Sequence, residues 1–217
     1  MTFACVLFDL DGTLLDTAPD LIAALNRSLK HYGVESVAES QIRPFISYGA
    51  LAMIQQSSAH DNDVENILDK MLADYQQRIA ENTVFFEGME QVLASLETQQ
   101  IKWGVVTNKR QRFTLPLMDA LNLSKRTSCI ISGDSAEHPK PHTAPMLMAC
   151  RQAEVNPEQC LYIGDALHDI EAGKNSGMKT LAAAYGYLKA DDDIHSWQAD
   201  AIIQKPLDIL SWMQLCH

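Results

Sequence analysis

Basic residues are scarce in this sequence: 17 lysines and arginines stand against 28 aspartates and glutamates in 217 residues, a formal net charge of −11. Because affinity for phosphate backbones comes chiefly from clustered lysine and arginine, this balance speaks against a nucleic-acid partner. Long apolar runs are also missing. Stretches such as 181–184 fall far short of the roughly 20 apolar residues that a bilayer-spanning helix needs, so we expect no membrane partner.

Paired cysteines are missing as well. The five cysteines are odd in number and scattered, and no two form a Cys-x-x-Cys pair: Cys5, Cys129, Cys150, Cys160 and Cys216. This pattern speaks against both a disulfide framework and a zinc site. The N-terminus shows no basic region ahead of an apolar run, so no secretory signal is expected. Together these features favour an ordinary globular protein of the reducing cytoplasm.

Short apolar runs that end in polar residues or glycine alternate with longer stretches of helical periodicity. The runs lie at 5–8, 103–106, 129–131, 160–163 and 180–183, with a weaker sixth at 201–203. Helical patterns lie at about 89–98, 111–121, 144–153, 169–175 and 207–215. Continuous apolar runs suit strands that are buried on both faces of a parallel sheet. The sequence therefore predicts an α/β fold.

The first two apolar runs are separated by nearly a hundred residues, too many for one crossover helix. The start of this segment places four apolar residues on one helical face, after Pro19: Leu21, Ile22, Leu25 and Leu29. A further helical pattern follows at 64–72. We therefore predict an all-helical insert over residues 18–84 in a core made of residues 1–17 and 85–217.

Polar residues that can do chemistry follow the apolar runs. Asp9 and Asp11 follow the first run, Thr107 and Asn108 the second, and Asp165 the fourth. In parallel α/β sheets the ligand crevice lies at the carboxyl ends of the strands. These side chains are therefore expected to converge, together with Asp169 and with Lys140, which lies just before another helical pattern.

Two carboxylates two residues apart at a strand end can divide the work of catalysis. A turn at Gly12 can redirect Asp11 toward a substrate, so that Asp9 acts as nucleophile and Asp11 as acid and base. Clustered acids repel one another, and Asp165 and Asp169 add more negative charge. A hard divalent cation is therefore needed. Magnesium is the best candidate, because it prefers oxygen ligands and retains waters beside a substrate phosphate.

Lys140 supplies the complementary charge for such a substrate. Its ammonium group can bind phosphate oxygens, while Thr107 offers a hydroxyl group and nearby backbone N–H donors. Positioning and charge stabilisation supply most of the rate in phosphoryl transfer. The residues therefore favour an enzyme that acts on a small phosphate ester.

These residues resemble the four ordered motifs of the haloacid dehalogenase superfamily: Phe8-Asp9-Leu10-Asp11-Gly12-Thr13, Thr107-Asn108, Lys140-Pro141 and Gly164-Asp165-x-x-x-Asp169. The resemblance spans the chain from Val6 to Pro206. It implies a Rossmann-like parallel-sheet core with a helical cap inserted after the first motif, which agrees with the insert inferred from spacing.

The resemblance also implies roles for the carboxylates. Asp9 would form an aspartyl-phosphate, and Asp11 would protonate the leaving alcohol and then activate water. Mg²⁺ would be held by Asp9, the backbone carbonyl of Asp11 and Asp165, with Asp169 acting directly or through water. The neighbouring motif residues would bind the substrate, with Lys140 also catalytic: Gly12, Thr13, Thr107, Asn108 and Lys140.

Within the superfamily, two groups share further segments with this chain. Segments 14–21 and 172–178 resemble phosphoglycolate phosphatases. The cap segment 42–50 departs from the Gly-x-Gly loop common in that group and, with segments 103–109 and 185–187, resembles N-acetylmuramic acid 6-phosphate phosphatases. Both substrates, 2-phosphoglycolate and N-acetylmuramic acid 6-phosphate, therefore stay open.

Three cap residues are candidates for substrate contact. Arg43 can pair with a substrate carboxylate in bidentate fashion or remain an exposed helix arginine. Ser47 and Gly49 lie in a small-residue loop that can contact the substrate or simply turn the chain.

His168, beside Asp169, is more typical of a solvent-side residue than of a catalytic base.

The leading prediction is a cytoplasmic, Mg²⁺-dependent phosphomonoesterase that acts on a small anionic metabolite as a monomer or homodimer. A sugar-phosphate mutase of the β-phosphoglucomutase type is the rival enzyme, and it would return the phosphate to the sugar instead of releasing it. A binding module on an inactive core is a remote alternative, because every motif residue is present.

Overall fold

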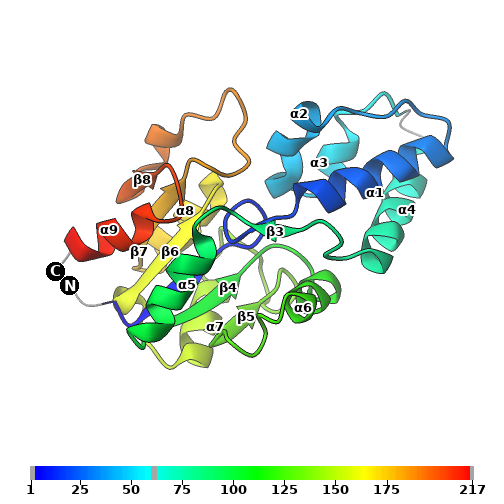
Figure 1. Ribbon diagram of the computed structural model, residues 1–217. Coiled ribbons are helices and arrows are strands. Elements are labelled where there is room, and N and C mark those ends of the chain that lie inside the picture. The colour runs from blue at the N-terminus through cyan, green and yellow to red at the C-terminus, as the bar shows by residue number, and fades with distance from the viewer. Residues whose placement is uncertain (1–2, 60–62, 216–217) are drawn as a thin grey trace.

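The computed structural model describes residues 3–59 and 63–215 and shows a six-stranded parallel sheet with helices around it (Figure 1). The strand order is β5-β4-β1-β6-β7-β8, and every neighbouring pair is parallel. The strands are β1 (Cys5–Phe8), β4 (Lys102–Val106), β5 (Cys129–Ile131), β6 (Cys160–Gly164), β7 (Lys179–Ala183) and β8 (Ala201–Ile203). The predicted α/β fold is confirmed, and the apolar runs are its strands.

Helices cover both faces of the sheet because alternate strand residues point to opposite faces. Val6 and Phe8 of β1 pack into one core with α5 (Met89–Thr98), α6 (Gln111–Ala120) and α9 (Asp208–Leu215). Cys5 and Leu7 of the same strand pack into another core with α7 (Ala144–Ala153) and α8 (Leu167–Asn175). Burial on both faces explains why β1 carries no polar side chain.

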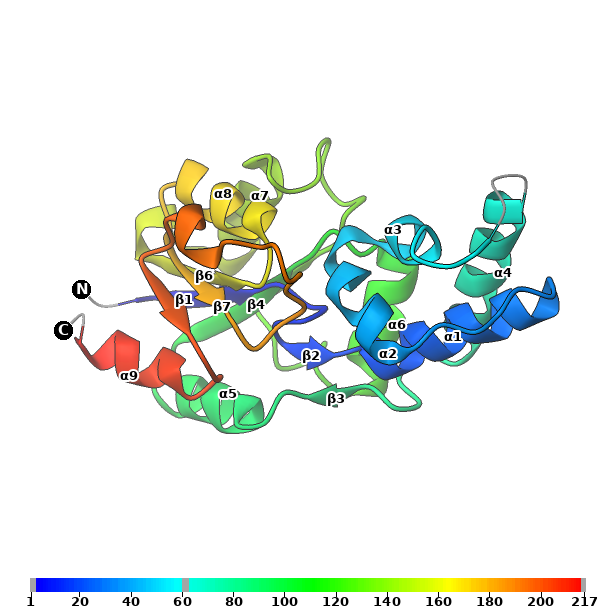
Figure 2. The same cartoon turned by 90° about the horizontal axis from the view of Figure 1, so that it is seen from above.

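A separate group of helices, the cap, is inserted between β1 and β4. It consists of α1 (Ala18–His31), α2 (Glu39–Ile42), the 3₁₀ helix η1 (Arg43–Tyr48), α3 (Ala50–Ile54) and α4 (Val64–Gln77). Figure 2 shows these helices beside the sheet and joined to it through β2 and β3. The predicted Rossmann-like core with an inserted helical cap is confirmed.

The cap has a hydrophobic core of its own. Leu21, Leu25 and Leu29 of α1 pack against Ile67 and Met71 of α4, and all five side chains are buried. These are residues of the apolar faces that the helical spacing indicated. Because its apolar residues pack largely against one another, the cap is a distinct packing unit.

Two short antiparallel strands close the entry and exit of the cap. In β2 (Leu15–Asp16) and β3 (Val84–Phe85), Leu15 pairs with Phe85 and Asp16 with Val84. Next to them, the buried carboxylate of Asp20 accepts hydrogen bonds from the backbone N–H groups of Asn82 and Thr83. Two-residue strands carry no periodicity, which is why the sequence did not indicate them.

Two of the predicted absences concern cysteines and membrane helices. The four cysteines in the described part of the chain are free and buried, and Cys216 lies outside the described residues. Among residues 3–59 and 63–215, no helix has the length and apolar character needed to cross a bilayer. The described chain also contains two 3₁₀ turns in the core, η3 (Pro157–Gln159) and η4 (Ile194–Trp197).

Candidate active site

The carboxyl ends of three adjacent strands bring the motif residues together. Asp9 follows β1, Thr107 follows β4 and Asp165 follows β6. Because β1 lies between β4 and β6, with Phe8 paired to Val105 on one side and Ile163 on the other, these three residues end at one edge of the sheet. The predicted convergence at the strand ends is therefore observed.

Three carboxylates form a buried acidic cluster at this edge. Asp9, Asp165 and Asp169 each offer an oxygen, and these oxygens lie within 4.8 Å of one another. The residues are 5%, 1% and 0% exposed. Asp169 comes from the first turn of α8, where its Oδ2 accepts a hydrogen bond from the backbone N–H of Ala166 at 3.1 Å. Acidic oxygens buried this close together require positive charge nearby.

Lys140 supplies part of that charge. Its Nζ lies 2.7 Å from Asp9 Oδ1 and 2.6 Å from Asp169 Oδ1, and the side chain is fully buried. It also donates to the hydroxyl oxygen of Tyr162 at 2.8 Å. Asn108 fixes the Lys140 backbone by accepting from its N–H at 2.9 Å and donating to its carbonyl at 3.1 Å. Asn108 thus holds the lysine loop as well as lining the cavity.

The acid–base balance of this cluster favours a bound cation. Burial raises the pKa of Asp9 to about 7, although the Lys140 cation acts to lower it. Burial and the charges of Asp9 and Asp169 raise the pKa of Asp165 well above its usual range. For Asp169, burial acts in the same direction, but Lys140 outweighs it and the pKa is lowered. One lysine therefore does not compensate three buried carboxyl groups, and a hard divalent ion fits the remaining oxygens.

The turn at Gly12 directs Asp11 away from this cluster. Gly12 has φ +87°, and a Cβ at this position would lie 2.2 Å from the Asp165 carboxylate, so only glycine fits. The Asp11 carboxylate accepts from the Thr17 hydroxyl at 2.6 Å and from Lys109 Nζ at 2.9 Å. Asp9 and Asp11 nevertheless line the same cavity.

Two threonines stand beside the carboxylates. The buried Thr13 hydroxyl donates to Asp165 Oδ1 at 3.2 Å. Thr107 is 3% exposed and lines the cavity, while its Oγ1 accepts from the Lys109 N–H at 3.2 Å. Thr13 therefore positions a carboxylate, whereas Thr107 faces the space where a ligand would lie.

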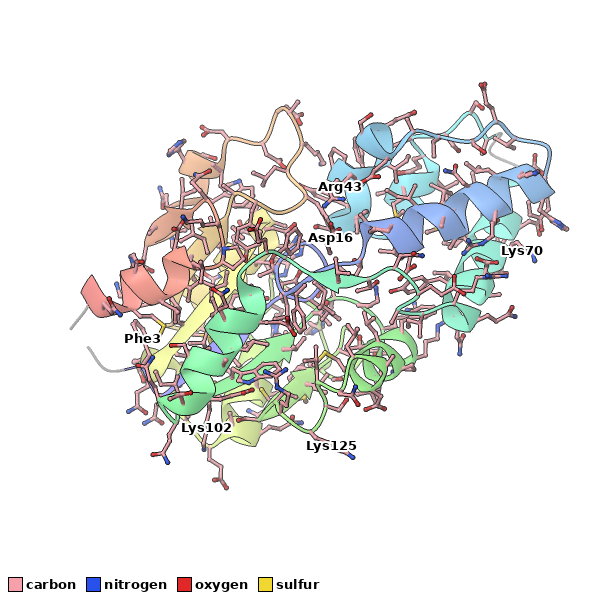
Figure 3. All side chains as sticks on the ribbon, viewed as in Figure 1. Phe3, Asp16, Arg43, Lys70, Lys102 and Lys125 are labelled. Carbon is pink, nitrogen blue, oxygen red and sulfur yellow. The ribbon has the colours of Figure 1, made fainter. Side chains whose placement is uncertain are left out.

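The cap residues predicted to touch substrate divide into two groups. Ser47 and Gly49 line the cavity, and the Ser47 hydroxyl donates to Asp165 Oδ2 at 2.9 Å. Arg43 is outside the cavity lining. Its guanidinium pairs with Asp16 at 2.7 Å and Glu39 at 2.8 Å, and Figure 3 shows Arg43 and Asp16 side by side where the cap meets the core. Arg43 therefore joins the cap to the core.

Sequence reasoning gave no role to Tyr187, which lies in the loop after β7. Its backbone N–H donates to Asp165 Oδ2 at 2.8 Å. Its hydroxyl accepts from the N–H groups of Thr17 and Ala18 and donates to Asp16 Oδ1 at 2.8 Å. Tyr187 thus connects the acidic cluster to the start of the cap. The available signal was its position just after a predicted strand, where the ligand edge of the sheet lies.

A cavity of about 540 Å³ lies between the sheet edge and the cap. The core supplies Asp9, Asp11 and Thr107, and the cap supplies mainly apolar side chains, among them Ile46, Met53, Leu68, Leu72 and Tyr75. Three basic residues outside the four motifs also line it: Lys109, Arg110 and Arg112. The cavity therefore has a polar floor, formed by the core residues, and a mainly apolar wall, formed by the cap.

This fold and site are those of a hydrolase family. The family model described as haloacid dehalogenase-like hydrolase matches residues 6–183, and the chain belongs to this family. The resemblance read from the four motifs is confirmed, and with it the prediction of a hydrolytic enzyme.

Relatives that match nearly the whole chain are named as phosphatases. N-acetylmuramic acid 6-phosphate phosphatase from Pseudomonas putida is 40% identical over 212 residues, covering 96% of this chain and 95% of that protein. Phosphoglycolate phosphatase from Xanthomonas campestris is 38% identical over 203 residues, covering 93% and 92%. The crystal structure of a predicted phosphoglycolate phosphatase from Haemophilus somnus has a TM-score of 0.87 at 26% identity, covering 99% of each chain.

Proposed function

We propose that this hydrolase is a Mg²⁺-dependent phosphatase that cleaves a small phosphomonoester through an aspartyl-phosphate on Asp9. The chain is a phosphoric monoester hydrolase, as its family and its full-length phosphatase relatives indicate. The observation that carries the mechanism is the buried cluster of Asp9, Asp165 and Asp169, in which Lys140 bridges Asp9 and Asp169 and from which Asp9 reaches the lining of the cavity.

Asp9 has the position of a nucleophile. Lys140 engages its Oδ1, which leaves Oδ2 to attack the phosphorus atom in line with the leaving oxygen. The Oδ2–P bond forms as the P–O bond to the alcohol breaks, and Asp11 transfers its proton to the departing oxygen. The Thr107 hydroxyl donates to a phosphoryl oxygen during this transfer, and the Lys140 ammonium, held on Asp9, places a positive charge beside the reacting group.

Hydrolysis of the acyl-phosphate reverses the role of Asp11. Now a carboxylate, Asp11 takes a proton from a water molecule, whose oxygen attacks the phosphorus. The bond between Asp9 and phosphorus then breaks, and inorganic phosphate leaves. A mutase would keep the phosphoryl group for transfer to a second sugar hydroxyl. Stoichiometric release of phosphate therefore separates the two enzymes.

The acidic cluster suits Mg²⁺. Asp9, Asp165 and the backbone carbonyl of Asp11 would hold the ion, which would neutralise charge on the phosphoryl oxygens when bound. Asp169 accepts from the Lys140 ammonium through Oδ1 and from the Ala166 N–H through Oδ2, whereas among the described residues only neutral donors reach Asp165. Because a cation already occupies Asp169, we assign this residue to the metal through water. Thr13, Ser47 and Tyr187 orient Asp165 by donating to its oxygens.

The cavity favours N-acetylmuramic acid 6-phosphate over 2-phosphoglycolate. A volume of about 540 Å³ lies within the range of pockets that enclose drug-sized ligands, and apolar side chains of the cap make up much of its wall. An amino sugar with a lactyl group fills such a space better than a two-carbon acid does. The relative from Pseudomonas putida carries the same substrate name.

The experiment is to measure phosphate release from both esters with Mg²⁺ and to compare kcat/KM, because discrimination lies in this ratio. We expect the sugar acid to be preferred by at least about a hundredfold, which corresponds to about 2.7 kcal/mol in transition-state binding. The opposite preference would assign the enzyme to 2-phosphoglycolate and leave most of the cavity unused.

The mechanism has its own test in Asp9→Asn, which changes little in volume. We expect activity to fall by at least about a thousandfold, because nucleophile removal abolishes the covalent route. The melting temperature shows whether the variant is folded, and Asp119→Asn, at an exposed position on α6, is the matched control. Retention of phosphatase activity by Asp9→Asn would overturn the proposed intermediate.

The location and partners form part of the same proposal. The four described cysteines are buried thiols, which suits a reducing cytoplasm. The partner is a small phosphate ester, and a monomer or a homodimer can provide the site because every residue named above comes from one chain.

A further inference from the structure

The part of the cavity wall that the core provides is positively charged, although the protein as a whole is acidic. Lys109, Arg110 and Arg112 lie within four residues of one another in a chain of net charge −11, and all three line the cavity. In the described part of the chain, neither Arg110 nor Arg112 forms an ion pair. A local basic wall in an acidic protein attracts anionic groups into the cavity.

Lys109 is the deepest of the three. Its side chain is 7% exposed, and its Nζ lies 2.9 and 3.1 Å from the two carboxylate oxygens of Asp11. Burial acts to lower the pKa of Lys109, but the Asp11 charge outweighs it, so the pKa lies above its usual value. The ammonium group is therefore charged and occupied by the residue that we assign to proton transfer.

Asp11 has a second partner that does not depend on the lysine. The Thr17 hydroxyl donates to Asp11 Oδ1 at 2.6 Å. If Lys109 turned to another anion, Asp11 would keep this hydrogen bond and remain anchored on the core side of the cavity. Lys109 itself, as a buried cation, can leave Asp11 only for a group that carries a negative charge.

The cap places a hydroxyl group beside this ammonium. Tyr75 of α4 is 1% exposed and lines the same cavity, and Lys109 Nζ lies 4.7 Å from the centre of its ring. Within residues 3–59 and 63–215 no well-formed hydrogen bond reaches the Tyr75 hydroxyl, while burial raises its pKa and the neighbouring Lys109 ammonium acts to lower it. Buried hydroxyl groups in folded proteins are normally hydrogen-bonded. A bound ligand can supply the partner for this one, because Tyr75 lines the cavity.

We propose that Lys109 and Tyr75 bind a carboxylate on the leaving-group part of the substrate, and that Lys109 releases Asp11 when it takes up this carboxylate. The inference rests on the proposed phosphatase function. A carboxylate has two oxygens, so it can accept from the ammonium group and from the phenol together. Asp11 then keeps its Thr17 hydrogen bond on Oδ1, and the Oδ2 released by the ammonium can serve the leaving oxygen, which ties proton transfer to the presence of the correct substrate.

The test uses two esters that differ by one group. N-acetylmuramic acid 6-phosphate carries a lactyl carboxylate on the sugar, whereas N-acetylglucosamine 6-phosphate has a hydroxyl group there. We expect the wild-type enzyme to prefer the first in kcat/KM by at least about tenfold, the order of one charged hydrogen bond. In Lys109→Met the preference should fall to within about threefold, mainly through loss of activity on the carboxylate ester.

Two further variants separate local contact from general charge. Arg112→Met removes one charge from the same wall, so it should lower kcat/KM for both esters alike, by less than about threefold. Tyr75→Phe removes only the orphan hydroxyl group and should reduce the preference by about threefold to tenfold. Should Lys109→Met fail to fold, inhibition of the wild type by N-acetylmuramic acid and N-acetylglucosamine provides the comparison, with tighter inhibition expected from the acid.

The outcomes distinguish this inference from the function on which it rests. Equal kcat/KM for the two esters in the wild type, or an equal loss on both in Lys109→Met, would overturn carboxylate binding by Lys109 while leaving the phosphatase intact. Failure of the phosphatase itself would appear as absence of Mg²⁺-dependent hydrolysis of p-nitrophenyl phosphate. If 2-phosphoglycolate is the substrate, kcat/KM is compared for 2-phosphoglycolate and 2-hydroxyethyl phosphate, which lacks the carboxylate.

Discussion

The floor of the cavity and its cap wall are built in different ways. On the floor, Lys140 Nζ lies within 2.9 Å of four oxygens, and the Asp165 carboxylate accepts from three donors, so each polar group is held by several partners. On the cap side, few polar contacts cross to the core, such as Ser47 to Asp165 and Arg43 to Asp16. The floor is therefore rigid, while the wall can vary.

This difference suits a division of labour between chemistry and selection. Phosphoryl transfer depends on positioned charges, which a rigid floor provides. Substrate choice depends on the shape and polarity of the wall, where a substitution disturbs few hydrogen bonds. We therefore expect substitutions in the floor to affect stability and metal binding strongly, and substitutions at the cap contacts to act weakly.

The largest loss of folding stability is expected from Lys140→Met. The substitution leaves Asp9 and Asp169 buried without their cation, and breaking a buried ion pair costs about 3–5 kcal/mol. For a chain of this length each kcal/mol lowers the melting temperature by about 2–4 °C. Calorimetry without Mg²⁺ measures the loss, with Lys125→Met as control because Lys125 is exposed and points away from the protein (Figure 3). Equal melting temperatures for the two variants would mean that the floor is not held by this charge.

A smaller change, in this case a gain of folding stability, is expected from Asp165→Asn in the metal-free protein. The folded-state pKa of Asp165 is raised, so this group contributes stability only at low pH and loses that contribution as the pH rises. The amide mimics the neutral form. With chelator at pH 8, the free energy of unfolding of Asp165→Asn should exceed that of the wild type by at least about 1 kcal/mol, the order of one pKa unit.

The difference in unfolding free energy between Asp165→Asn and the wild type should shrink toward pH 5, because Asp165 of the wild type, whose pKa is raised, becomes protonated and then resembles the amide. Added Mg²⁺ should raise the melting temperature of the wild type but not of the variant. Unfolding curves with and without Mg²⁺ at both pH values measure these shifts. Equal stabilisation of both proteins by Mg²⁺ would exclude Asp165 as a metal ligand.

The smallest effect is expected at the junction between cap and core. Arg43→Met breaks a partly exposed ion pair with Asp16, and such pairs contribute about 0–1 kcal/mol. We expect kcat/KM to fall by less than about fivefold, because the cap closes less completely. Arg27→Met is the matched control, since Arg27 pairs with Asp74 inside the cap. A loss of a hundredfold or more would instead place Arg43 on the substrate.

Much of the fold and of the floor could be predicted from local patterns. The apolar runs at 5–8 and 129–131 coincide with β1 and β5, and the long interval between the first two runs indicated the cap. The rule that parallel strands end at one edge was enough to bring Asp9 and Asp165 together. Lys140 was expected near the phosphate, although its direct bridge between Asp9 and Asp169 could not be read from spacing.

The contacts of Arg43 and Lys109 were harder to predict because they join residues that are distant in the chain. Arg43 was a candidate for substrate contact, and its pairing with Asp16, 27 residues away, could not be read from the chain. Lys109 follows a motif residue, but its partners Asp11 and Tyr75 come from another strand end and from the cap. Periodicity reports which face of a helix is apolar, and it says nothing about which element that face will meet.

By itself, the sequence determined the α/β class, the presence of a helical insert and the residues that form the acidic floor, because these follow from short-range periodicity and from polar residues at strand ends. Only the tertiary structure decided how the cap meets the core. It is there that Tyr187 and Ser47 orient Asp165, and that Lys109 lies against the ring of Tyr75. Packing between two hydrophobic cores sets those contacts, and no local pattern in the chain encodes it.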